Sequence, residues 1–244
     1  MKHIDMKQLY DNLSQKELQE IESQSQLLEK IWQKIGFNHA LSANEVLKIV
    51  YGSDIEIPVN PVKIIEHFNI KLTEDETMQF EGLTQFDGYT LEIRYKPTNN
   101  NRDRFTLAHE LGHIFLHFLE GKKFDFQDKA IRHGYNNENG VGGIQKELQP
   151  VIFKEAREEK STSVLEREAN IFAGELLIPK IKIDELKNIL PKNHRYKQSN
   201  LCQYFQVSNG TMYHTMNYYG EWENMVKDDY TWWHVIAYLA YSFL

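Results

Sequence analysis

The segment 106-TLAHELGHIFLH-117 contains three histidines and a glutamate among mostly apolar residues. In a helix, residues i and i+4 lie one above the other on the same face, so His109 and His113 can direct both imidazoles at one point. Two such nitrogen atoms are typical ligands of a zinc ion. Glu110 lies about 100° further round the helix, where its carboxylate could accept a proton from a water held by the metal. The spacing therefore predicts a hydrolytic metal site.

The histidines also have a structural interpretation, in which they are capped or half-buried side chains of an ordinary helix. The other side chains of the segment are apolar almost all round, which predicts a buried helix: Leu107, Ala108, Leu111, Ile114, Phe115 and Phe118. Burying two imidazoles and a carboxylate without partners would cost roughly several kcal/mol, and a bound metal removes much of that cost. The composition of the helix thus favours the metal site.

A catalytic zinc needs a third protein ligand and leaves its fourth position to water. The metzincin pattern fails here, because Leu116 and Leu119 stand where its glycine and third histidine would be. His117 lies one turn beyond His113, about 6 Å along the helix axis, so it should overshoot the metal. We expect His117 to support the site from behind its ligands or to be structural.

The second apolar helix, 165-LEREANIFAGELLIP-179, offers a better third ligand. Glu166 and Asn170 are four residues apart and share a face. This is the gluzincin arrangement, in which a glutamate binds zinc and the following polar group holds a ligand histidine in the correct tautomer. Glu168 is the competing ligand, but two residues of helix turn it about 160° away from Glu166. We predict Glu166 as the ligand and Asn170 as the partner of a ligand histidine.

The two helical segments resemble the ImmA/IrrE family of intracellular zinc metallopeptidases. The resemblance rests on RFTLAHELGHIFLH (104–117) and EREANIFAGELLIP (166–179), with weaker matches at NPVKIIEHFNIKL (60–72) and FQVSNGTMYHTMNYYG (205–220). Together these segments span roughly residues 55–220.

The resemblance implies that His109, His113 and Glu166 bind zinc and that Glu110 is the catalytic base. It also implies a substrate class, the helix-turn-helix transcriptional repressors that control mobile-element, phage or stress-response genes. The sequence departs from the family at several positions: Gly174 and Ile178 stand where Ala and Met are usual, and Thr215-Met216 replaces an Arg-Leu pair. The zinc motif itself is intact.

The elements around the motifs predict an α+β fold, mainly helical, with a small mixed or antiparallel sheet packed on the HExxH helix as in zincins. Capping signals at Ser14 and Ser42 and a proline at position 61 begin the first three helices. Strands are expected within 70–72, 82–86 and 88–96, where β-branched and aromatic residues partly alternate. We predict three regions: a helical N-terminal region (1–52), a zincin-like peptidase core (53–180) and a helical C-terminal region (181–244).

An extended substrate could pair with an edge of this sheet near 89-YTLEIRY-95, which would place Tyr89, Leu91 and Ile93 against it. The alternative is that this strand belongs to the core. A further donor should stabilise the oxyanion, and the chain offers four candidates among which the sequence does not choose: Tyr213, His214, His194 and Tyr196.

The charge pattern argues against direct binding of nucleic acid. Net charge is −7 over 244 residues, and the basic residues are scattered. Residues 199–219 have a helix–turn–helix look, but no Lys or Arg lies between Gln198 and Val226 to contact phosphates. We interpret this segment as a packing element.

The single cysteine, Cys202, excludes an intramolecular disulfide and suggests a reducing compartment. The polar N-terminus lacks the apolar stretch of a secretion signal, and the longest apolar run, 231–244, is too short to span a bilayer comfortably. We therefore expect a cytoplasmic protein without a membrane partner. The sequence does not indicate an oligomeric state.

A second class of function is a non-catalytic protein that keeps zinc and acts by binding a partner. A purely structural zinc site usually has four protein ligands and no adjacent glutamate such as Glu110, which favours the enzyme. The apolar tail, with Trp232 and Trp233, indicates burial against its own core or against another chain.

Overall fold

A computed structural model describes residues 14–121, 130–133 and 162–227 of the chain. Its helices are α2 (Gln15–Ile35), α3 (Ala43–Tyr51), α4 (Pro61–His67), α5 (Asn101–Gly112), the π-helix η1 (His113–Phe118), α6 (Thr162–Leu177), α7 (Lys180–Ile189), α8 (Gln198–Phe205), α9 (Asn209–Tyr218) and α10 (Trp222–Met225). Its strands are β1 (Lys71–Glu74), β2 (Gly82–Phe86), β3 (Leu91–Tyr95), β4 (Ala130–His133), β5 (Tyr196–Lys197) and β6 (Val226–Lys227).

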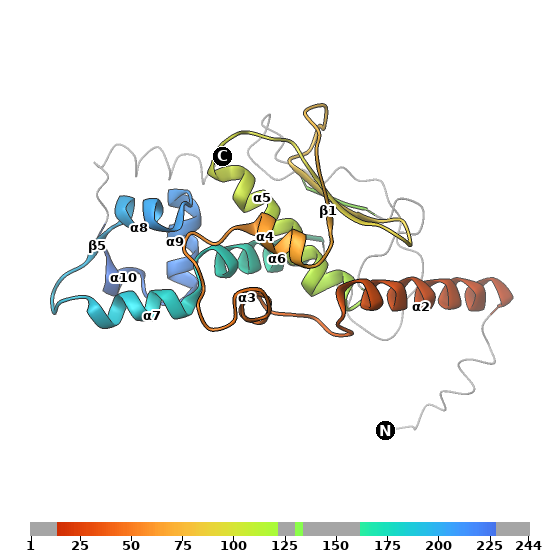
Figure 1. The fold of residues 1–244 in the computed structure, drawn as a ribbon, viewed down its shortest axis with the longest axis horizontal. Coiled ribbons are helices and arrows are strands. Elements are labelled where there is room, and N and C mark those ends of the chain that lie inside the picture. Colours follow the sequence, from red (N-terminus) through yellow and green to blue (C-terminus); the bar gives the residue numbers. More distant parts are fainter. Residues whose placement is uncertain (1–13, 122–129, 134–161, 228–244) are drawn as a thin grey trace, which may run out of the picture.

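The expected α+β class, mainly helical with a small mixed sheet, is confirmed in this part of the chain. In Figure 1, α2 lies at one end of the molecule and α7 to α10 at the other, with α5 and α6 between them. The expectations for the polar N-terminus (residues 1–13) and for the apolar run 231–244 lie outside the described residues. The division into three regions stays a prediction.

The larger sheet has four strands in the order β1-β3-β2-β4. Strand β1 runs parallel to β3, and the other two pairs are antiparallel, so the sheet is mixed. Strands β2 and β3 are joined by a turn at Asp87-Gly88, where the Asp87 carboxylate accepts hydrogen bonds from the backbone N–H of Tyr89 and Thr90.

The position of β3 corrects the expectation for a substrate strand. Both edges of β3 are hydrogen-bonded, to β1 on one side and to β2 on the other, and Leu91 and Ile93 are fully buried. A substrate backbone therefore cannot pair there, and the core interpretation of this strand is the correct one. Tyr89 precedes the strand and is 82% exposed.

The predicted capping signals form the ends of the short helices. Ser42 and Glu45 make a reciprocal capping box at the start of α3, in which the Glu45 carboxylate accepts a hydrogen bond from the Ser42 N–H at 2.8 Å. Pro61 occupies the first turn of α4, and the Asn60 side chain accepts a hydrogen bond from the Val62 N–H. These caps begin both helices at the residues that the sequence indicates.

One hydrophobic core joins the described helices to the inner face of the sheet, from Leu27 and Ile31 of α2 to Met225 of α10. Helices α5 and α6 approach closely at Gly112, where an added methyl group would lie 3.0 Å from the Ala169 Cα. Arg104 of α5 donates hydrogen bonds to the carbonyl oxygens of Val59 and Gln206, which ties α5 to the end of α8. Among the described residues, none of the helices has the length and apolar character needed to cross a membrane.

Candidate metal centre

The helix that carries the histidine motif changes its winding within the motif. Asn100 caps the start of α5, where its side chain accepts a hydrogen bond from the Arg102 N–H at 2.7 Å. Helix α5 ends at Gly112, and the chain continues without a break as the π-helix η1, where the Leu119 N–H donates to the Ile114 carbonyl. The sequence predicts one helix over this range, and the π-helical turn at its end is a difference from an ordinary α-helix.

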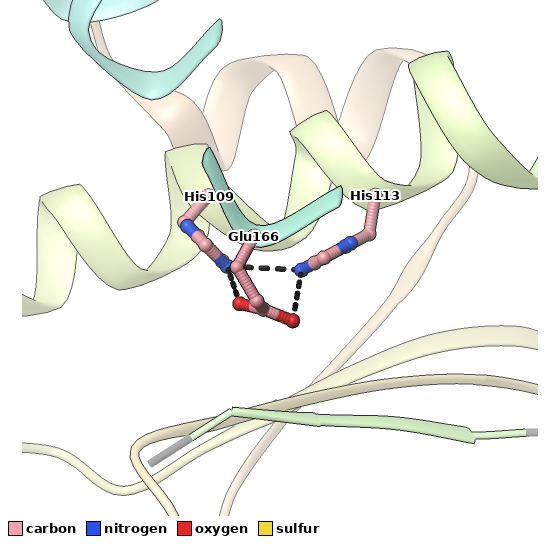
Figure 2. Close-up of side chains that lie close together, drawn as sticks. All are labelled: His109, His113 and Glu166. Carbon is pink, nitrogen blue, oxygen red and sulfur yellow. Dashed lines mark hydrogen bonds and ion pairs between the residues drawn. The ribbon is translucent and has the colours of Figure 1, made fainter. Parts of the chain in front are cut away.

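His109, His113 and Glu166 converge on one point, as Figure 2 shows. The two Nε2 atoms of the histidines are 2.9 Å apart. The Glu166 carboxylate comes from α6 and lies 3.2 Å from His109 Nε2 and 3.6 Å from His113 Nε2. Both rings are fully buried, and the Glu166 side chain is 19% exposed. The structure thus brings the three predicted ligands together.

The donor set fits a zinc ion. A tetrahedral site with bonds of about 2.0–2.1 Å places its donor atoms about 3.3–3.4 Å apart, and the three separations here bracket that value. Burial lowers the pKa of His113 to about 3, so its ring is neutral at neutral pH. A neutral imidazole is the form that binds a metal.

Glu110 lies beside these ligands and contacts the sheet. Its side chain is fully buried, and its Oε2 atom accepts a hydrogen bond of 2.6 Å from the hydroxyl of Thr84 in β2. Gly82, at the start of the same strand, leaves the space for this carboxylate, because a methyl group there would collide with Glu110 Oε1. Sequence reasoning missed both residues. The feature of the sequence that could have identified them is the presence of a glycine and a threonine at alternate, core-facing positions of this strand.

Asn170 and His117 each contact a ligand ring from behind. Asn170 Oδ1 lies 2.9 Å from His109 Nδ1, as the gluzincin spacing predicts. His117 Nδ1 lies 3.0 Å from His113 Nδ1, so His117 faces the site although it is not in the ligand cluster. Glu168, the competing ligand, is directed to His117 Nε2 at 3.4 Å.

Three of the four candidates for an oxyanion donor make contacts away from the ligand cluster. The Tyr196 hydroxyl donates to the Leu186 carbonyl at 2.9 Å, and His194 Nδ1 lies 3.1 Å from the Lys192 carbonyl oxygen. Tyr213 packs edge-on against the Trp222 ring. None of these contacts involves a residue of the metal cluster, and the oxyanion donor stays unassigned.

The chain matches the model of a known protein family. The Peptidase_M78 family model, described as the IrrE N-terminal-like domain, matches residues 65–139 and 143–217. These ranges cover more than half of the chain and contain α5, η1 and α6, together with Gly82 and Thr84. No curated protein matches the chain.

Proposed function

Because this chain belongs to the Peptidase_M78 family of IrrE N-terminal-like domains, we propose that it is a zinc-dependent endopeptidase with Glu110 as its catalytic base. The family match also confirms the ImmA/IrrE resemblance of the sequence. The observation that carries the proposal is the convergence of His109, His113 and Glu166 beside a buried glutamate. A pair of imidazoles and one carboxylate is a typical ligand set of a zinc peptidase.

His109 and His113, through their Nε2 atoms, and Glu166 would hold the ion and leave one position of a tetrahedral site open. When bound, zinc supplies Lewis acidity, which lowers the pKa of a water and polarises a carbonyl group. The burial of both rings keeps bulk water from competing for the two nitrogen atoms.

Glu110 would move the proton during hydrolysis. Its carboxylate accepts a proton from the attacking water as the water oxygen bonds to the peptide carbon. The same carboxylate then gives that proton to the amide nitrogen as the C–N bond breaks, so the products are a carboxylic acid and an amine, which exchange the remaining water proton to become a carboxylate and an ammonium group. The hydrogen bond from Thr84 fixes the orientation of Glu110 through both transfers.

The substrate class that we propose is a helix-turn-helix transcriptional repressor, and it rests on the family resemblance alone. Cleavage of such a protein would switch on the genes that it represses. The single cysteine, Cys202, is consistent with action in the reducing cytoplasm.

The proposal is tested by metal content and cleavage measured on the same purified protein. Elemental analysis should find about one zinc per chain after zinc is supplied at neutral pH. A peptide library prepared from a digested bacterial proteome, incubated with the protein, should acquire new termini that mass spectrometry detects. The Glu110→Gln variant should bind the same zinc and cleave no peptide, whereas Glu76→Gln, which changes an exposed carboxylate, should cleave as the wild type does.

Two results would contradict the proposal. Absence of zinc from the wild type would mean that the histidines of α5 and η1 are structural. Zinc binding without cleavage of the library or of a bound repressor would instead favour the non-catalytic, partner-binding protein.

A further inference from the structure

We infer that Glu168 and His117 form a hydrogen-bond chain that positions His113 as a metal ligand; this inference rests on the zinc site proposed above. Neither residue belongs to the ligand cluster. Glu168 would therefore not be a spare ligand. It would be the end of a chain of contacts that runs from α6 through η1 to the metal.

The contacts of the chain are continuous. His113 Nδ1 lies 3.0 Å from His117 Nδ1, and His117 Nε2 lies 3.4 Å from Glu168 Oε2. The His117 side chain is 1% exposed, whereas that of Glu168 is 29% exposed. A buried imidazole thus joins the outer nitrogen of a proposed ligand to a carboxylate that solvent can reach.

His117 follows His113 at the same four-residue spacing that separates His113 from His109. Helical residues at this spacing lie on one face. The ring centroids are 4.7 Å apart for His109 and His113 and 5.1 Å apart for His113 and His117. The second pair lies in the π-helix η1, where the Leu119 N–H donates to the Ile114 carbonyl. The helix thus places a third histidine behind the second.

Metal binding fixes the direction of every proton in the chain. His113 Nε2 faces the ligand cluster, so in the metal-bound form this atom carries the lone pair and Nδ1 carries the proton. His113 Nδ1–H then donates to His117 Nδ1, which leaves the proton of His117 on Nε2. His117 Nε2–H donates to Glu168, whose oxygen only accepts. All donors point away from the metal, so the chain favours the tautomer of His113 that binds zinc.

The two histidine ligands are then supported in parallel by one helix. Asn170 of α6 accepts from His109 Nδ1 directly, and Glu168 of α6 supports His113 through His117. Glu166, between these contacts, supplies the ligand itself. Three polar residues within one and a half turns of α6 would therefore act on one metal.

The test is the zinc affinity of Glu168 variants, measured by competition with a chromophoric chelator. Glu168→Ala should weaken zinc binding about 10-fold, at the low end of the 10- to 100-fold typical of residues that orient metal ligands. Glu168→Gln should lose less, because its amide oxygen still accepts a hydrogen bond. Glu175→Ala, about two turns further along α6, is the matched control and should bind zinc as the wild type does.

A second measurement separates positioning from a structural role. The visible spectrum of the Co²⁺-loaded protein should shift in Glu168→Ala and return towards that of the wild type in Glu168→Gln, while urea unfolding of the metal-free forms stays the same. At the buried position, His117→Asn should retain more zinc affinity than His117→Phe, because Asn Oδ1 can accept from His113.

Several outcomes would overturn the inference. Unchanged affinity and spectrum in Glu168→Ala would show that the chain does not act on the metal. Loss of zinc as complete as in Glu166→Ala would show that Glu168 is a ligand. If the wild type itself binds no zinc, the proposed function fails first, and the two failures are thus distinguishable.

Discussion

The two elements that flank the α5–η1 helix contact different parts of the proposed site. On one side, the hydroxyl of Thr84 in β2 binds the carboxylate of Glu110. On the other side, α6 directs Glu166 at the Nε2 atoms of the histidines and Asn170 at the back of one ring. The proposed proton-transfer group and the histidines of the ligand cluster are thus contacted by separate elements. Substitutions on the sheet side should affect turnover, and substitutions on the α6 side should affect the metal.

The largest effect is expected for Glu166→Ala on the α6 side. This variant removes one of three ligands, so its zinc affinity should fall by more than the roughly 10- to 100-fold that an orienting residue contributes. Elemental analysis after dialysis should find little zinc, while Glu110→Gln, treated in the same way, keeps its metal. If Glu166→Ala kept its zinc, Glu166 would not be a ligand, and the distinction between a sheet side that affects turnover and an α6 side that affects the metal would fail.

A smaller effect is expected for Thr84→Val on the sheet side. Valine keeps the shape of threonine but cannot donate to Glu110, and a hydrogen bond to a charged group contributes about 1.5–3 kcal/mol. If this whole free energy is lost from the transition state, kcat falls about 10- to 160-fold. Zinc content should not change, and Thr84→Ser, which keeps the hydroxyl, should recover most of the rate. Loss of zinc in Thr84→Val would mean that the sheet also holds the metal.

The far face of α6 gives a prediction about stability. A methyl group at Gly174 would collide with the hydroxyl of Thr215 in α9. The Thr215 side chain is buried and β-branched, so it cannot easily rotate away. Gly174→Ala should therefore destabilise the protein by about 1–3 kcal/mol. In a Thr215→Ala background the same change should become neutral or stabilising by up to about 1 kcal/mol, because alanine favours the helix. A double-mutant cycle of urea unfolding measures this coupling, and simple additivity would contradict it.

The smallest effect concerns the outer face of the sheet. Burial alone would raise the pKa of Glu92, but contacts with Thr73, Lys71 and Gln85 outweigh it and lower that pKa. A lowered folded-state pKa stabilises the protein above the unfolded carboxyl pKa of about 4.3, and this stabilisation is lost as pH falls through the folded value. Glu92→Gln should therefore lose less stability than the wild type below about pH 4.3, by about 1 kcal/mol or less. If the wild type and Glu92→Gln lost the same free energy of unfolding on acidification, the lowered pKa of Glu92 would be contradicted.

The sequence predicted the site residues on the helices better than those on the sheet, for a physical reason. His109 and His113, like Glu166 and Asn170, are paired by helical periodicity, which depends only on neighbouring residues. His117 was expected to lie beyond the metal and to support its ligands or be structural, and it lies outside the ligand cluster in contact with His113. Thr84 lies in β2, far from Glu110 in sequence, and only the docking of the sheet on α5 brings the two together.

The same distinction applies to the fold. The caps of α3 and α4 and the limits of β2 follow from neighbouring residues, and the sequence predicted them closely. The central position of β3 in the sheet could not be predicted from neighbouring residues, because its parallel pairing with β1 joins segments that are separated in the sequence. The expected substrate strand was wrong for that reason: alternation identifies a strand but does not show which strands lie at the edges.

The two helices that carry the site are far apart in the sequence, which has a consequence for biosynthesis. His109 and its α6 partner Asn170 are separated by 61 positions in the chain. Translation proceeds from the N-terminus, so α5 leaves the ribosome well before α6. A nascent chain at that stage offers two imidazoles and no carboxylate from α6. Loading of the metal would then belong to the last steps of maturation, after α6 has docked, and the chain would stay inactive while it is being made.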